Sequence, residues 1–84
     1  MERILVSKVS ETIRSLRSQK RLSQQRLAEL SGLDRAYISG VERGLRNLTL
    51  ESLESIIFGL SVTPEEFFNA LTYKLSEGKV KSDS

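Results

Sequence analysis

The sequence contains no cysteine, no histidine and no tryptophan, and only one proline among its 84 residues. Without cysteine, the chain can form neither a disulfide framework nor a thiolate metal site. Without histidine, it lacks the commonest general base and the commonest metal ligand. Neither a phosphate-binding loop nor a nucleophile beside a base takes their place. The composition therefore argues against an enzyme, and we expect no catalytic residue, no metal and no cofactor.

Long apolar runs are missing as well. No segment approaches the length of a membrane span, and the N-terminus has no signal-peptide core, so we expect a soluble intracellular protein with no membrane partner. A chain this short forms one domain with a small core, for which association of subunits is a reasonable source of further stability. It also leaves little room for a small-molecule ligand.

Acidic residues are scarce in the first half of the chain. Residues 1–48 hold 10 lysines and arginines against 5 acidic residues, whereas residues 49–84 hold 3 against 6. This asymmetry suggests an anion-binding surface in the N-terminal half. The alternative is the ordinary variation in charge of a small domain.

Apolar residues recur at helical intervals, and alternating strand patterns are almost absent. We expect helices at about 7–20, at 24–31, at 35 to 42 or 43, from 50 to about 60, and from 64 through 75. The expected N-caps are Ser23, Asp34, Thr49 and Thr63, and Gly32 and Gly44 are the expected stops. The sequence thus predicts an all-α domain over residues 1–76, followed by a flexible polar tail over residues 77–84.

The helix expected at 35–43 has two different faces. At about 100° per residue, Ile38 and Val41 point inward. The outward face holds Ala36, Ser39, Gly40 and Arg43, with Arg35 at its edge. That face is small, polar and basic, which suits close approach to a surface rich in phosphate or guanine. Together with the preceding helix and the glycine turn, it predicts a helix-turn-helix.

The spacing of particular residues then carries a resemblance. The pattern Gln24, Leu27, Ala28, Gly32, Leu33, Ile38, Ser39, Glu42 and Gly44 is similar to the helix-turn-helix of the phage-repressor and Cro (XRE-type) family. The stretch LDRAYISGVERGLRNLTLESLESI more narrowly resembles the controller proteins of bacterial restriction–modification systems. The resemblance implies a five-helix DNA-binding domain of a bacterial, cytoplasmic, nucleoid-associated protein, with the helix-turn-helix at the second and third helices.

The resemblance also implies roles for individual side chains on double-stranded DNA. The residues expected to contact bases are Arg35, Ala36, Tyr37 and Arg46. Arg35 would bind guanine O6 and N7, and Ala36 would touch a thymine methyl group. For Tyr37, the alternative is a half-buried ring that supports the turn.

The residues expected to contact the DNA backbone are Gln24, Ser39, Arg43 and Asn47. The backbone amide of Gln24 lies at a predicted helix N-terminus, which favours an anion in any family. Arg17 and Glu42 match a buried ion pair that joins the first helix to the end of the third in such repressors. We interpret this pair as structural.

Helix-turn-helix regulators usually bind as dimers, because one recognition helix covers too few base pairs. The C-terminal half has more apolar residues than a small core needs, and we assign Phe58, Phe67 and Leu71 to a symmetric dimer interface. The alternative is that all three fill the core of the monomer. A two-fold dimer places its recognition helices about 34 Å apart, so the operator should be an approximate palindrome.

A controller protein would bind tandem sites upstream of its own gene and the endonuclease gene. It would activate at low dose and repress at high dose, when a second dimer binds cooperatively. Activation requires contact with RNA polymerase, for which Glu29 is a candidate by analogy. The alternatives are a prophage or plasmid repressor, and an antitoxin-type module whose C-terminal half holds a protein partner.

Overall fold

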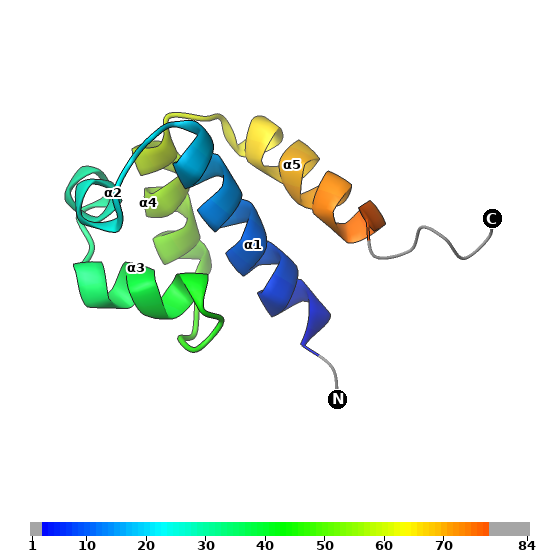
Figure 1. Ribbon diagram of the computed structural model, residues 1–84, viewed down its shortest axis with the longest axis horizontal. Coiled ribbons are helices and arrows are strands. Elements are labelled where there is room, and N and C mark those ends of the chain that lie inside the picture. The colour runs from blue at the N-terminus through cyan, green and yellow to red at the C-terminus, as the bar shows by residue number, and fades with distance from the viewer. Residues whose placement is uncertain (1–2, 78–84) are drawn as a thin grey trace.

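The computed structural model describes residues 3–77, and within them the chain forms five helices and no strand (Figure 1). The helices are α1 (Ile4–Gln19), α2 (Gln24–Ser31), α3 (Arg35–Glu42), α4 (Leu50–Leu60) and α5 (Pro64–Glu77). The predicted all-α class is therefore confirmed. The expected tail over 77–84 lies outside the described residues except for Glu77, which is helical.

The first helix begins about one turn earlier than the sequence predicts. The residue before it, Arg3, makes no side-chain capping hydrogen bond, so the local signal that usually marks a helix start is absent. The other boundaries follow their caps. In α2, α4 and α5 the expected pairs form within 3.0 Å: Ser23 with Arg26, Thr49 with Ser52, and Thr63 reciprocally with Glu66. Asp34 precedes α3 without such a bond.

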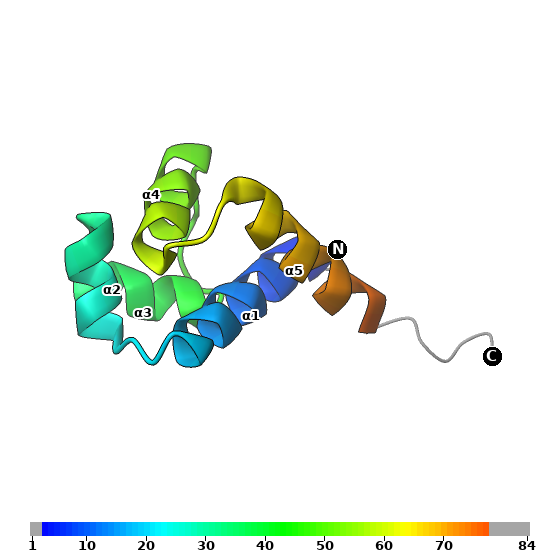
Figure 2. The same ribbon diagram turned by 90° about the horizontal axis from the view of Figure 1, so that it is seen from above.

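Gly32 makes the tight turn between α2 and α3. Its φ of 72° is left-handed, and a Cβ atom added there would meet nothing within 4 Å. The backbone conformation, not packing, therefore requires glycine at this position. After this turn α3 crosses α2 steeply, as both views show (Figures 1 and 2).

The core lies between two pairs of helices, because α2 packs against α4 and α5 packs against α1 (Figure 2). The fully buried apolar residues of this core, to which α3 contributes Ile38, are Ile13, Leu27, Ile38, Ile56, Leu60 and Phe67. Within residues 3–77, none of the helices has the length and hydropathy of a membrane-spanning segment.

Two residues expected at the dimer interface belong to this core instead. Phe67 is 0% exposed and Leu71 is 6% exposed in the single chain, so the assignment of both to a subunit interface is wrong. The reason is that α5 folds back against α1 and buries the face that carries them. Of the three predicted interface residues, only Phe58 lies on the surface, at 78% exposed.

Candidate functional site

The outer face of α3 lies at the edge of the molecule (Figure 1). Arg35, Ala36 and Arg43 are exposed on it, whereas Ile38 and Val41 point into the core. The helical wheel therefore places these five residues on the correct sides. About two turns of helix present two arginines and small side chains, backed by an apolar face.

Gly40 departs from the predicted arrangement, because it is buried although it was expected on the outward face. The side chain of Arg46 covers it. A Cβ atom at Gly40 would overlap Cγ of Arg46 and lie 3.1 Å from its Cδ. The outer face of α3 is thus completed by a residue from the following loop, which helical periodicity alone could not reveal.

Tyr37 holds that loop, which spans residues 43–49, against α3. Its hydroxyl donates a hydrogen bond to the backbone oxygen of Asn47 at 2.8 Å. The guanidinium carbon of Arg46 lies 5.0 Å from the centroid of the Tyr37 ring, within the range of a cation–π contact. The half-buried ring that supports the local structure is therefore present. A contact between Tyr37 and DNA stays a prediction.

The carboxylate of Glu42, with its side chain only 2% exposed, fixes the end of α3. Arg17 donates to both of its oxygens, from Nε at 2.6 Å and from Nη2 at 2.9 Å, and Gln24 Nε2 donates at 3.0 Å. Arg14 Nη1 donates to the backbone oxygen of Glu42 at 2.8 Å. One buried carboxylate thereby joins α1, α2 and α3.

The hydrogen bond to Glu42 raises the pKa of Arg17 above its ordinary value. A cation whose pKa is raised by folding contributes stability below its unfolded-state pKa for as long as the carboxylate that it pairs with is ionised. The guanidinium of Arg17 is protonated throughout the neutral range.

Gln24 is accordingly engaged within the protein. Its side-chain amide serves the Glu42 carboxylate, so a phosphate contact at this position would use the backbone N–H groups at the N-terminus of α2.

Sequence reasoning missed two residues that hold α3 in place. Ser10 Oγ lies 2.7 Å from the backbone oxygen of Val41, and Arg14 contacts Glu42 as described above. The signal was available, because Ser10, Arg14 and Arg17 follow the i, i+4, i+7 spacing of one helix face. This polar stripe on α1 meets the C-terminal end of α3.

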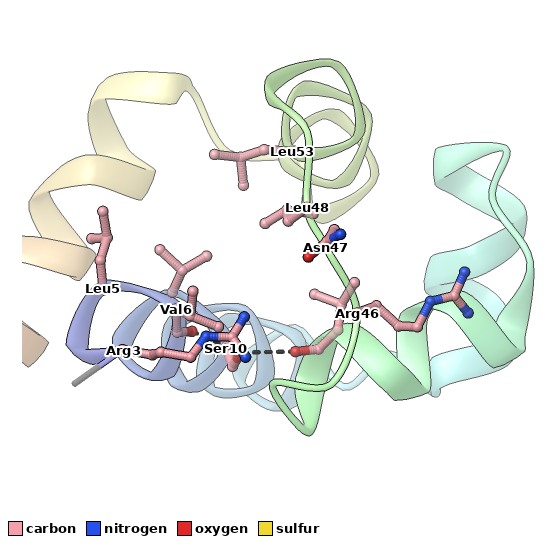
Figure 3. Close-up of a pocket in the computed structure, with 10 residues that line it drawn as sticks. Arg3, Leu5, Val6, Ser10, Arg46, Asn47, Leu48 and Leu53 are labelled. Carbon is pink, nitrogen blue, oxygen red and sulfur yellow. Dashed lines mark hydrogen bonds between the residues drawn. The ribbon is translucent and has the colours of Figure 1, made fainter. Parts of the chain in front are cut away.

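A groove of about 410 Å³ lies between the start of α1, the loop 43–49 and α4 (Figure 3). Its apolar lining includes Leu5, Val6, Leu48 and Leu53. Figure 3 shows the side chain of Arg46 leaving this groove and running across α3. Since Leu5 is 57% exposed, the groove offers apolar surface next to the candidate DNA-binding loop.

Phe58 projects from a different and more acidic surface. The depression beside it, between α2 and α4, is lined by Glu29 and Glu54. Hydrogen bonds from Gln25 and from Arg26 lower the pKa of Glu29, so its exposed carboxylate is ionised at neutral pH.

Within residues 3–77 no cluster of three acidic side chains could hold a metal ion.

Comparison with known proteins gives consistent matches. A helix-turn-helix family model matches residues 13–67. The control protein C.SmaI of Serratia marcescens is 39% identical over 70 residues, which is 83% of each chain. The control protein C.BamHI of Bacillus amyloliquefaciens is 37% identical over 70 residues, covering 82% of this chain and 86% of that one.

Solved structures agree with these relatives. The restriction–modification controller protein C.Esp1396I is 49% identical, with a TM-score of 0.86 over 88% of this chain and 97% of that one. A second structure shows C.Esp1396I as a tetramer in complex with its natural 35 base-pair operator, with the same identity, TM-score and coverage.

We predict that Glu42→Gln lowers the free energy of unfolding by about 3 kcal/mol, because the guanidinium of Arg17 loses its charged partner in a largely buried site. Urea denaturation followed by circular dichroism measures this. The control is Glu29→Gln, which breaks the exposed pair with Arg26 and should leave the midpoint unchanged. Equal midpoints for the two variants would contradict the structural role of Glu42.

Proposed function

The chain belongs to the helix-turn-helix family of DNA-binding transcription regulators and, within it, to the restriction–modification control proteins, and we propose that it acts as a homodimer on a palindromic operator upstream of its own gene. The observation that carries this proposal is the outer face of α3, which exposes Arg35 and Arg43 beside the small Ala36. The contacts of Glu42 with Arg17 and Gln24 fix the end of this helix. In this proposal the protein binds the bacterial chromosome and catalyses no reaction.

In the proposed complex the N-terminal end of α3 enters the major groove. Arg35 binds O6 and N7 of a guanine, and Ala36 contacts a thymine methyl group. Arg46 and Tyr37 reach bases from the side of the loop. These four residues supply the sequence preference, since only base contacts and DNA shape carry sequence information.

Contacts to phosphates fix the position of α3 in the groove. The backbone at Gln24 offers a helix N-terminus to one phosphate, and Ser39, Arg43 and Asn47 flank the recognition helix. These contacts depend on charge more than on sequence, so they should give the salt dependence of binding.

The proposed regulation follows from tandem operators. One dimer activates the chain's own gene and the endonuclease gene, and a second dimer, binding cooperatively beside it, represses them. The operator-bound tetramer of C.Esp1396I supports this part of the proposal. The ionised carboxylate of Glu29, on the exposed face of α2, is the proposed contact with RNA polymerase.

The experiment that tests the proposal is a gel shift on the DNA upstream of the chain's own gene, with competitor DNA present at two salt concentrations. We expect a discrete, competitor-resistant complex, followed at higher protein concentration by a slower one. A smear that salt and competitor abolish would reduce the interaction to non-specific attraction for phosphate. The antitoxin-type alternative would then be tested by a search for a protein that binds the C-terminal half.

Replacing Arg35 should weaken operator binding and relax its specificity. We predict that Arg35→Ala costs about 1–3 kcal/mol of binding free energy, because a bidentate contact with guanine is lost. Fluorescence anisotropy with the operator and with a duplex changed at the contacted base measures both effects. Lys74→Ala on α5 is the matched control, since it removes one positive charge away from α3. An equal loss of affinity in both variants would show that Arg35 acts only through charge.

For the dimer contact we propose two surfaces, the groove beside Leu5 and the surface around Phe58. The groove is concave, largely apolar and adjacent to the loop 43–49. Phe58 is the more exposed side chain, but Glu29 and Glu54 beside it would approach their own copies across a two-fold axis. The lining of the groove also includes Arg3 and Arg46, so its apolar surface, and not an absence of charge, makes it the principal contact in this proposal.

We predict that Leu5→Ser raises the dissociation constant of the dimer at least about tenfold, because each copy loses roughly one buried leucine. Phe58→Ser should have a smaller effect. Sedimentation equilibrium measures both, and circular dichroism checks that each variant is folded. A larger effect of Phe58→Ser would place the interface on the α2–α4 surface instead.

A further inference from the structure

We propose that Gly40 is a positioning residue for DNA recognition, because its missing side chain lets Arg46 lie across α3 and hold its guanidinium on the recognition face. This inference rests on the proposed function and names a residue that the function itself does not use. Gly40 has no side chain to offer a base or a phosphate, so its role must act through a neighbour.

The first step of the argument is the closeness of the two residues. Gly40 is buried on an otherwise outward-facing side of α3, and the atoms that bury it belong to Arg46. A Cβ atom would overlap Cγ, which lies near the base of the arginine side chain and not at its flexible end. Any larger residue at position 40 must therefore displace the whole side chain of Arg46.

The second step is what the present path of Arg46 achieves. Having crossed Gly40, the side chain places its guanidinium carbon 5.0 Å from the centre of the Tyr37 ring. The same ring anchors the loop through the hydrogen bond from its hydroxyl to the Asn47 oxygen. A backbone hydrogen bond also joins the loop to α3, because Leu45 N donates to Gly40 O at 2.8 Å.

These contacts order Arg46 before any DNA arrives. A free arginine side chain loses considerable rotamer freedom when it binds, and a side chain already held in one path loses less. Arg46 also lines a depression of about 330 Å³ together with Ala36 and Tyr37, beside the N-terminal end of α3. Gly40 thus links the geometry of the loop to that of the recognition helix.

The choice of glycine has a cost that supports a functional reason for it. Within a helix, alanine is more favourable than glycine, and φ at Gly40 is not in the left-handed region where glycine is needed. Outside the backbone of α3 itself, the three atoms nearest to such a Cβ all belong to the side chain of Arg46. Gly40→Ala should consequently fold, with a thermal midpoint close to that of the wild type, because the gain in helix propensity offsets the lost contact between Arg46 and Tyr37.

The test is a double-mutant cycle with Gly40→Ala, Arg46→Ala and the double variant, measured by fluorescence anisotropy on the DNA upstream of the chain's own gene. We expect Gly40→Ala to weaken binding about threefold to tenfold, through the lost stacking and ordering of Arg46. In the Arg46→Ala background the same change should have no further effect.

Wild-type affinity for Gly40→Ala would overturn the inference, and so would losses that add fully in the double variant. A thermal midpoint of Gly40→Ala below that of Arg46→Ala would also overturn it, because loss of the Arg46 contacts alone would then not account for the change and the backbone would have moved. Failure of the wild type to bind the DNA specifically would instead contradict the proposed function.

A second readout needs no DNA. In the free wild-type protein, the ring current of Tyr37 should shift the side-chain proton resonances of Arg46 upfield. In Gly40→Ala these resonances should return to the values of an exposed arginine, and in Tyr37→Leu they should do the same. Unchanged resonances in Gly40→Ala would show that Arg46 keeps its path without glycine at position 40.

Discussion

The buried carboxylate of Glu42 is the interaction on which the rest of the structure depends. An ionised group in the interior is costly unless charged and polar partners surround it, and here Arg17 and Gln24 provide them from two different helices. Because the partners come from α1 and α2, the network forms only when three helices are in place. The orientation of α3 is thereby tied to the folding of the whole N-terminal half.

A recognition surface benefits from this rigidity. Three sets of contacts restrain α3. They are the Glu42 network, the contact of Ser10 with the Val41 oxygen, and the packing of the apolar residues Ile38 and Val41 in the core. None of these groups faces outward. The exposed side of the helix is therefore available for the residues that we propose to contact DNA, while its buried side and its end hold it in the fold.

Much of the fold could be predicted from local signals. Four helices began where the caps and the proline indicated, since a cap acts within three residues of its own position. The start of α1 was missed because Arg3 provides no cap. Periodicity also separated the inward Ile38 from the outward Arg35, although it could not report that Arg46 folds back over Gly40, a contact between residues six apart on different elements.

The sequence by itself determined the class of the fold, the helix-turn-helix and the basic character of the face that α3 presents. These properties follow from spacing along one helix and from composition, which are local. Only the tertiary structure decided the fate of Phe67, Leu71 and Phe58, three apolar residues with similar sequence signals. Packing of α5 against α1 buries Phe67 and Leu71, whereas Phe58 lies on an exposed face of α4. This difference depends on contacts between segments that are distant in the sequence.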